Sequence, residues 1–434
     1  MKQRSEFLKK QFGISEQVCA IAENALEKAL DSGAFAAVDE IKELNQYKVI
    51  KAFQDMKVSD SMFNGTSGYG YDDRGRDTLD KVFAQVFGAE AALVRQQIVS
   101  GTQAIAICMF GVLRPGMNLV SATGKPYDTL EEVIGIRQDD TQNTGSLKDF
   151  GVAFRQADLL ADGSIDFEKL KSLIDADTGM VLIQRSRGYD WREALSIQAI
   201  KQACAQIKVL NKDTVILVDN CYGEFVETLE PTDVGGDLIA GSLIKNPGGG
   251  LALTGGYVAG RKKLVELAAN RLTSPGLGAH VGPSLSQNRA FFQGLFMAPH
   301  VVAESIKGAI FCGLFMKSLG FEVSPEPGDF RGDIIQAVKF GAEEPMIAFC
   351  QGIQMGSPID SFVEPQPWDM PGYEHQVIMA AGGFVQGASI ELSADAPLKP
   401  PYIAYMQGGL VLEHVKLGLM MSVQKMLEKG LITL

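Results

Sequence analysis

The chain has 434 residues, of which 46% are hydrophobic and 21% are charged, and its formal net charge is -12. A chain of this length exceeds the size at which one hydrophobic core keeps growing, so a large domain and a smaller one are expected. The acidic balance, without a strong basic patch, excludes nucleic acid and anionic membranes as expected partners. Six scattered cysteines without a CxxC pair, and no signal-like or membrane-spanning stretch, predict a cytoplasmic protein.

The first part of the chain is predicted to be helical and then irregular. Residues 16–58 are expected to form two helices, because apolar residues recur at helical spacing on either side of a break at 31–33. A loop rich in glycine and tyrosine is predicted at 63–76, since it is too polar for a core element.

From residue 77 onward, predicted helices alternate with short apolar strands. The helices are expected at 77–87, 102–113, 128–136, 166–174 and 197–210. The strands are expected at 91–94, 117–121, 151–154, 180–184 and 214–218. Nearly unbroken apolar strands separated by helices indicate an α/β fold, with a mainly parallel sheet covered on both faces.

The pattern changes near residue 284. A long apolar helix is predicted at 284–319, followed by alternating stretches at 333–338, 376–380 and 388–392 and a last helix at 410–428. These elements predict a smaller α+β domain at the end of the chain. The expected division is therefore a helical segment at 1–58, a large domain at 59–283 and a small domain at 284–434.

Asp219 ends an apolar strand and is a candidate for cofactor binding. The carboxyl ends of parallel strands are where ligands collect in open sheets. A carboxylate that closes a buried strand is costly without a partner, and the protonated ring nitrogen of pyridoxal phosphate (PLP) is one such partner. A helix cap and a metal ligand are the alternatives for Asp219.

Lys245 lies between an apolar strand and the triple glycine 248–250. Glycine lets the backbone approach a ligand closely, so this lysine is a candidate to carry a cofactor aldehyde as a Schiff base. The amine must be uncharged to attack, and we expect burial to lower its pKa in the needed direction. A solvated loop lysine is the alternative.

Two further segments precede predicted helices. Ser100, Gly101 and Thr102 open the helix at 102–113, where free N–H groups and the helix dipole favour a phosphate. The alternative is an ordinary helix cap, because any Ser-Gly N-cap has a similar pattern. Tyr127 precedes the helix at 128–136, and its ring can stack on a cofactor ring. The alternative is a buried tyrosine whose hydroxyl is hydrogen-bonded.

The order of these segments resembles fold-type I PLP enzymes, and more narrowly the lyases of cysteine and methionine metabolism. Asp219-Asn220 resembles the Asp-Asn pair of that family, and Ser242 resembles its phosphate-binding serine. Within the superfamily, the segments 68–77, 242–250 and 385–395 resemble the group of aluminium-resistance, cystathionine β-lyase-like proteins. The resemblance covers most of the chain.

This resemblance implies a mainly parallel seven-stranded sheet between helices, PLP as cofactor and a set of site residues. The implied catalytic residues are Lys245 and Tyr127. The implied cofactor-binding residues are Ser100, Gly101, Thr102, Tyr127, Asp219, Ser242, Lys245, Tyr71 and Arg74. In such lyases a Tyr-x-Arg pair reaches the phosphate of a neighbouring subunit, so a homodimer or homotetramer with shared active sites is implied. Tyr71 and Arg74, followed by Arg76, are the candidates here, and a solvated turn is the alternative.

Three departures from the lyase pattern stand out. Ile244 occupies the position where the lyases usually offer a threonine to the phosphate. The loop at 68–76 is nearer to the next helix than in the lyases. The arginine that normally binds the substrate carboxylate has no C-terminal match. Arg187 is a candidate to bind that carboxylate or the phenolic oxygen of the cofactor, and Arg331 is a weaker candidate.

The implied function is a PLP-dependent lyase that cleaves a carbon–sulfur bond of a sulfur amino acid by β- or γ-elimination, with Lys245 as the general base. A PLP aminotransferase or decarboxylase with the same lysine, and a non-catalytic protein of this fold linked to aluminium tolerance, are the alternatives. A Rossmann NAD enzyme is disfavoured because a GxGxxG fingerprint is missing. The four histidines lie far apart in sequence, so no metal site is expected.

Overall fold

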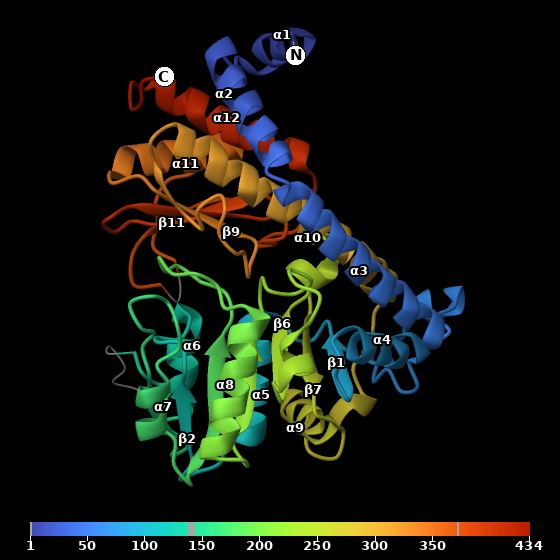
Figure 1. The fold of residues 1–434 in the computed structure, drawn as a ribbon. Helices are drawn as coiled ribbons and strands as arrows, with labels where there is room; N and C mark the ends of the chain where they lie inside the picture. Colours follow the sequence, from blue (N-terminus) through green and yellow to red (C-terminus); the bar gives the residue numbers. More distant parts are fainter. Residues whose placement is uncertain (1, 138–143, 371–372) are drawn as a thin grey trace. The chain divides into compact units, whose positions relative to one another are not determined.

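The computed structural model describes residues 2–137, 144–370 and 373–434, and Figure 1 shows its elements. The chain divides into two compact units, residues 44–188 with 194–298 and residues 1–43 with 189–193 and 299–434. Two of the boundaries fall inside helices, α3 (Ala34–Asp55) and α10 (Asn288–Ser318). A boundary inside a helix has no linker that the amino-acid composition could reveal. The expected division at residues 58 and 283 stays a prediction.

The first unit contains a seven-stranded sheet. Its strands are β1 (Ala91–Arg95), β2 (Asn118–Ser121), β3 (Ala153–Gln156), β4 (Thr178–Gln184), β5 (Val215–Asp219), β6 (Leu238–Ser242) and β7 (Gly256–Gly260). The strand order is β1-β7-β6-β5-β4-β2-β3, and only β7 runs antiparallel to its two neighbours. The expected mainly parallel seven-stranded sheet is therefore confirmed.

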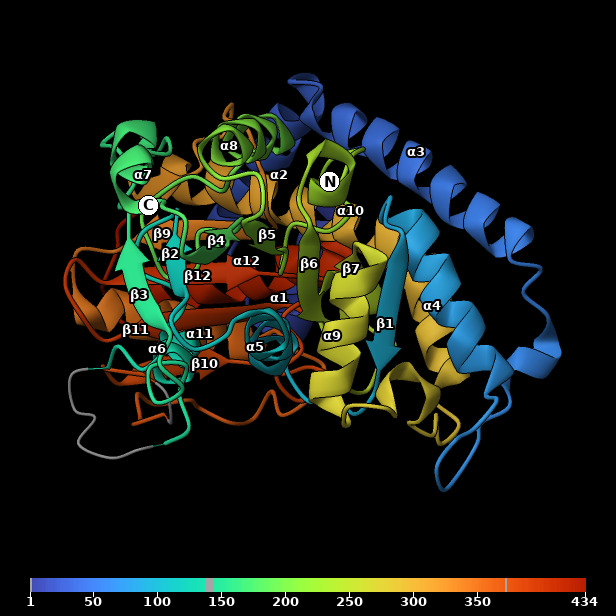
Figure 2. The same cartoon turned by 90° about the horizontal axis from the view of Figure 1, so that it is seen from below.

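Helices cover both faces of this sheet, which explains why its strands are apolar on both sides. They are α4 (Arg74–Val86), α5 (Gly101–Val112), α6 (Asp128–Ile134), α7 (Phe167–Leu173), α8 (Ile197–Leu210) and α9 (Lys262–Leu272). In Figure 2, α7 and α8 lie on one face and α5 and α9 on the other. Short 3-10 helices occupy Asp60–Phe63, Pro231–Val234, Asn246–Gly248 and Gly278–His280.

Helix α4 begins earlier than the sequence predicts. The side chain of Asp73 caps it by accepting a hydrogen bond from the backbone N–H of Arg76 at 2.9 Å. An aspartate at this position satisfies one of the free N–H groups of the first turn. Arg74, which was expected in a loop, therefore lies in the first turn of a helix.

The second unit contains a five-stranded antiparallel sheet in the order β10-β11-β12-β9-β8. Its strands are β8 (Glu322–Ser324), β9 (Ile335–Lys339), β10 (Val377–Ala380), β11 (Ser393–Pro397) and β12 (Ile403–Gln407). Helices α1 (Lys2–Phe12), α2 (Glu16–Asp31), α11 (Glu343–Met355) and α12 (Leu412–Glu428) belong to the same unit. The expected α+β character is confirmed.

The strand expected at 388–392 is wrong. Those residues form turns and bends, and β11 begins only at Ser393. The carboxylate of Glu391 accepts hydrogen bonds from the backbone N–H groups of Phe384 and Val385, at 2.7 and 2.9 Å. This side chain folds the loop back on itself, so an alternating apolar pattern forms no strand there.

Helix α10 is long and apolar enough to cross a membrane, although no such stretch was expected. In its most apolar window, 72% of the residues are buried inside the structure. A buried core helix of a globular protein can be equally long and equally apolar. The buried residues Ala309, Phe311 and Phe315 of this helix belong to the hydrophobic core of the five-stranded unit.

Candidate active site

The carboxyl ends of β4, β5 and β6 border a pocket in the seven-stranded unit. The pocket holds about 510 Å³ of empty space, open solvent included, which is the size of a small-molecule site. It is lined by Gly101, Thr102, Ile105, Tyr127, Thr129, Leu130, Gln184, Ser186, Gly188, Asp219, Cys221, Tyr222 and Lys245. Four segments that lie far apart in sequence, and that the sequence singled out, therefore meet in one place.

Lys245 follows β6 and lines this pocket. Its Nζ atom lies 4.1 Å from the centroid of the Tyr222 ring. Burial lowers the pKa of Lys245, but the acidic groups around it, above all Cys221, Tyr222 and Asp219, outweigh burial and raise it. Burial also raises the pKa of the Cys221 thiol. The expected lowering of the lysine pKa is therefore wrong, because acidic side chains are buried beside the amine.

Asp219 is the last residue of β5 and is 8% exposed. Burial raises the pKa of its carboxyl, and the positive charge of Lys245 lowers it in part. Its Oδ1 atom accepts a hydrogen bond from the backbone N–H of Cys221 at 3.1 Å. No helix follows directly, so the alternative of a helix cap does not apply. Within the described ranges, no group of three His, Cys, Asp or Glu side chains is placed to hold a metal ion.

A cradle for an anion lies at the start of α5. The Ser100 hydroxyl caps this helix by accepting a hydrogen bond from the Gln103 N–H at 3.1 Å. A Cβ atom at Gly101 would lie 3.3 Å from the sulfur of Cys221 and 3.7 Å from the Cβ of Ser242. Glycine therefore keeps open a space between the helix N-terminus and Ser242, which is 2% exposed. Free N–H groups and the helix dipole favour a phosphate in such a space.

Tyr127 and Thr102 also line the pocket. Tyr127 directly precedes α6, and a Cβ atom at Gly188 would lie 3.6 Å from its ring. The hydroxyl groups of Thr102 and Thr129 lie 2.6 Å apart, which joins the start of α5 to α6. The structure therefore places Tyr127 where its ring forms part of the pocket wall.

Arg187 is not among the residues that line the pocket, although Ser186 and Gly188 on either side of it are. Its side chain is 1% exposed. Arg331 belongs to the five-stranded unit, where its guanidinium donates to the Oε1 atom of Gln336 at 2.7 Å. Substrate binding by either arginine stays a prediction.

Tyr71 and Arg74 are both exposed and lie outside the pocket. The ring of Tyr71 is 57% exposed and stacks on Tyr69 with 5.5 Å between the ring centroids. These side chains lie on the surface of the seven-stranded unit. Their predicted contact with the phosphate of a second subunit stays a prediction.

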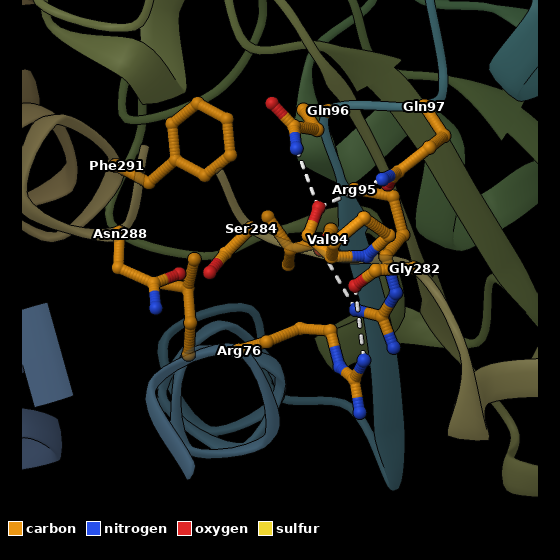
Figure 3. A pocket seen from close by; sticks show the side chains of 11 residues that line it. Arg76, Val94, Arg95, Gln96, Gln97, Gly282, Ser284, Asn288 and Phe291 are labelled. Atoms are coloured by element: carbon orange, nitrogen blue, oxygen red, sulfur yellow. Dashed lines mark hydrogen bonds between the residues drawn. The ribbon is translucent and has the colours of Figure 1, made fainter. Parts of the chain in front are cut away.

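The buried side chain of Arg76 links two loop segments of the seven-stranded unit. It is 3% exposed, and its Nη1 atom donates to the carbonyl oxygens of Gly70 and Gly282 at 2.6 and 2.9 Å. Figure 3 shows this side chain in a small, separate pocket beside Arg95 and Ser284. The guanidinium thus links Gly70 to Gly282, and its suggested contact with the phosphate of a second subunit stays a prediction.

The sequence analysis did not predict a buried network of polar side chains around Arg185, which directly follows β4. Arg185 is 0% exposed and donates to the side-chain oxygen of Asn220 at 2.9 Å and to Glu227 at 3.1 Å. Its Nη1 atom also lies 3.5 Å from Glu230, which is 0% exposed. The sequence analysis also did not predict Tyr222 as a residue of the pocket. The polar run that follows Asp219 was the signal that could have pointed to these residues.

The mainly parallel seven-stranded sheet, covered by helices on both faces, is the fold of the fold-type I PLP-dependent enzymes. The methionine gamma-lyase family matches residues 18–427, and the chain belongs to that family. YnbB, an uncharacterized protein of Bacillus subtilis (strain 168), is 52% identical over 413 residues, which cover 95% of this chain and 98% of that protein.

Solved structures agree with this assignment. The carbon-sulfur lyase involved in aluminum resistance from Clostridium novyi NT is 49% identical, with a TM-score of 0.93 over 98% of this chain and 99% of that chain. The methionine gamma lyase CalE6 from Micromonospora echinospora is 16% identical, with a TM-score of 0.53 over 80% of this chain and 86% of that chain, and shares the fold. The resemblance to the aluminium-resistance group is confirmed.

Proposed function

We propose that this protein is a PLP-dependent carbon–sulfur lyase that acts on a sulfur amino acid and binds its cofactor through Lys245. The observation that carries the proposal is the meeting of Gly101, Asp219 and Lys245 around one pocket. A related structure that is 49% identical bears the name of a carbon-sulfur lyase, and this supports the reaction type.

The residues of the pocket fit the parts of PLP. The space beside Gly101 suits a phosphate, because a side chain there would meet Cys221 and Ser242. The buried carboxyl of Asp219 suits the protonated ring nitrogen, which would offset the cost of its burial. The amine of Lys245 suits the aldehyde, and the ring of Tyr127 can pack against the cofactor ring.

When bound, PLP supplies an electron sink that makes the α-proton of an amino acid acidic. Asp219 would hold a positive charge on the ring nitrogen and so keep that sink strong. Lys245 would take the α-proton on its Nζ atom as general base, once substrate has released the amine. The raised pKa of Lys245 in the cofactor-free chain means that its ammonium form must lose a proton before the amine can bond to the aldehyde.

The first test is spectroscopic. The purified protein with PLP should show the visible absorption band of a lysine-bound cofactor, and Lys245→Ala should lose it. Lys262→Ala, which changes an exposed lysine at the start of α9, is the matched control and should keep the band. An intact band in Lys245→Ala would remove Lys245 from its role.

The second test is catalytic. A panel of sulfur amino acids should release a thiol, a keto acid and ammonia in the wild type and in Lys262→Ala. Amino exchange that requires an added keto acid would instead assign an aminotransferase. A lysine-bound cofactor without turnover of any amino acid would assign a non-catalytic protein of this fold.

We also propose a reducing, cytoplasmic location and a homodimer or homotetramer with shared sites. The six cysteines are all free and buried, which supports a reducing compartment. The exposed Tyr71 and Arg74 are the side chains that would reach a second subunit. Arg187 remains the proposed partner of the substrate carboxylate.

A further inference from the structure

The turn that follows β5 carries three residues of the pocket, Asp219, Cys221 and Tyr222. Tyr222 and Phe225 of this turn have left-handed backbone conformations, with φ of 70° and 63°. Such conformations are costly for residues other than glycine and persist only where the surrounding structure holds them. The contacts that hold this turn are therefore contacts that keep the pocket in shape.

The side chain of Arg185 packs against this turn. It is 0% exposed, and a Cβ atom at Gly223 would lie 2.4 Å from its Cδ atom. Its Nη1 atom donates to the Oδ1 atom of Asn220 at 2.9 Å, and its Nη2 atom donates to Glu227 at 3.1 Å. The planar guanidinium thus bonds to both ends of the turn, and glycine at 223 lets the backbone pass close to it.

Glu230 completes this set of contacts. Its Oε2 atom accepts a hydrogen bond from the Nδ2 atom of Asn220 at 3.0 Å and lies 3.5 Å from the Nη1 atom of Arg185. Its Oε1 atom accepts a hydrogen bond from the backbone N–H of Phe225 at 3.0 Å. The side-chain amide of Asn220 is therefore bound at both ends, and the left-handed Phe225 is bonded to the same carboxylate.

The same arginine is tied to Asp219 through the backbone. The N–H of Arg185 donates to the carbonyl oxygen of Asp219 at 3.1 Å. The Asp219 carboxyl in turn accepts a hydrogen bond from the N–H of Cys221 at 3.1 Å. A change in the turn moves the donor of that second bond. The direction of the Asp219 carboxyl therefore depends on Arg185, which is not among the residues that line the pocket.

The turn is also bonded to the segment that carries Lys245. The side-chain N–H of Asn246, the residue after Lys245, donates to the carbonyl oxygen of Glu224 at 3.0 Å. The carboxyl of Glu224 accepts a hydrogen bond from the Tyr257 hydroxyl at 2.8 Å. The Lys245 amine lies 4.1 Å from the ring centroid of Tyr222 in the same turn. The shape of the turn thus affects the lysine as well as the aspartate.

We propose that Arg185 is a positioning residue for the pocket: it holds the turn of residues 219–230 so that the Asp219 carboxyl and the Tyr222 ring line the space in which the cofactor binds. Its part in cofactor binding rests on the proposed function, whereas its part in shaping the turn does not. Arg185 and Glu230 carry opposite charges. Replacing both with neutral side chains therefore removes the guanidinium without leaving Glu230 as a buried charge that has lost its cation.

The test uses the cofactor-free, full-length chain, in which isotope-labelled cysteine gives one NMR amide signal for each of the six cysteines. Cys221→Ala identifies the Cys221 signal. In Arg185→Met/Glu230→Gln this signal should move, and the amide should exchange with solvent about tenfold faster, because its bond to Asp219 is weakened. The signals of the cysteines in the five-stranded unit, Cys19, Cys312 and Cys350, should stay in place. An unchanged Cys221 signal in the folded double variant would overturn the proposal.

Two more variants exclude a general loss of structure. Arg95→Met/Asp80→Asn is the matched control, because it removes another buried arginine–carboxylate pair of the same unit, with 2.7 Å between the charged groups. It should leave the Cys221 signal in place, and an equal shift there would overturn the proposal. Arg185→Lys keeps a cation beside Glu230 but lacks the planar guanidinium. It should fold even if the double variant does not, and it should also move the Cys221 signal; an unmoved signal would contradict the role of the guanidinium.

The cofactor separates the two proposals. Arg185→Met/Glu230→Gln should bind PLP about tenfold more weakly than the wild type, and the visible band of its lysine-bound cofactor should have a different pH midpoint, because the Asp219 carboxyl has lost its direction. If that band forms in neither protein, the proposed function fails, while the Cys221 signal still decides whether Arg185 shapes the turn. If the band forms with equal affinity and equal pH dependence in both proteins, the role of Arg185 in cofactor binding fails alone.

Discussion

The amine of Lys245 lies 4.1 Å from the centroid of the Tyr222 ring, and the backbone of Tyr222 holds the ring there in a left-handed conformation with φ of 70°. For a residue other than glycine this conformation costs about 1–3 kcal/mol. A cation over an aromatic face contributes about 0.5–2 kcal/mol in return. Backbone strain at Tyr222 is thus coupled to the charged form of Lys245.

Changing Tyr222 to leucine should make the lysine amine more reactive at low pH, because the ring no longer stabilises its charge. A loss of about 1 kcal/mol corresponds to a pKa lower by about 0.7 units. The measurement is the rate at which PLP forms its lysine-bound absorption band as a function of pH. Tyr222→Phe keeps the aromatic face and should behave as the wild type, so equal profiles for the two variants would refute the coupling.

Gly101→Ala should weaken PLP binding by about tenfold, since the added Cβ would narrow the phosphate cradle. The crowding comes from the Cys221 sulfur at 3.3 Å. Cys221→Ala in the same chain removes that sulfur and should restore most of the affinity. The check is a PLP titration of the two single variants and the double variant. Additive losses in the double variant would mean that the two residues do not share this space.

Much of the sheet and part of the site could be read from the sequence, because both depend on local patterns. Apolar strands such as 214–218 separated by helices predict a parallel sheet, and strand ends predict where a site lies. Asp219, Lys245 and Gly101 follow from that reasoning. The start of α4 did not follow, because it depends on the cap that Asp73 supplies.

The roles of Tyr222 and Glu224 depend on tertiary structure, and so sequence patterns could not reveal them. Both lie in a turn without periodicity, and each gains its place from residues distant in sequence, Lys245 for Tyr222 and Tyr257 for Glu224. The pKa of Lys245 was misjudged for the same reason. Burial was foreseeable from the sequence, but the acidic side chains buried beside the amine were not.

Arg185→Met should destabilise the protein by about 3–5 kcal/mol, because it leaves Glu230 buried without its cation. Burial already raises the pKa of Glu230, and Arg185 is the main group that lowers it. Urea denaturation measures the loss. Adding Glu230→Gln to this variant removes the buried carboxylate that has lost its cation, so part of the stability should return. If no stability returns, the loss in Arg185→Met comes from packing and not from the unpaired charge.

The stability of the wild type relative to Glu224→Gln should fall as the pH rises. The pKa of Glu224 is about 8 in the folded chain, above the ordinary value of 4.5. An acid whose pKa is raised on folding favours the folded state fully below its unfolded pKa, and this contribution is lost as the pH rises through the folded pKa. Glutamine is neutral throughout. Between about pH 5 and about pH 8, the difference in unfolding free energy should decrease by on the order of 3 to 4 kcal/mol.

Urea denaturation of both proteins across that pH range gives this difference, and subtracting the two curves removes the contribution of all other groups. Glu227→Gln, which changes a carboxylate paired with Arg185, is the matched control. A constant difference between the wild type and Glu224→Gln would show that the carboxyl titrates alike in the folded and unfolded chains.

Mixing two inactive variants tests whether the active site is shared between subunits. Lys245→Ala lacks the proposed catalytic amine, and Arg74→Ala lacks the exposed arginine proposed to reach the partner's phosphate. In a twofold dimer the same surfaces meet on both sides, so a mixed dimer regains one intact site. Random exchange should then restore about a quarter of the wild-type activity. Arg114→Ala, which removes an exposed arginine elsewhere, should be active before any mixing. Full activity of Arg74→Ala alone would mean that each chain completes its own phosphate site.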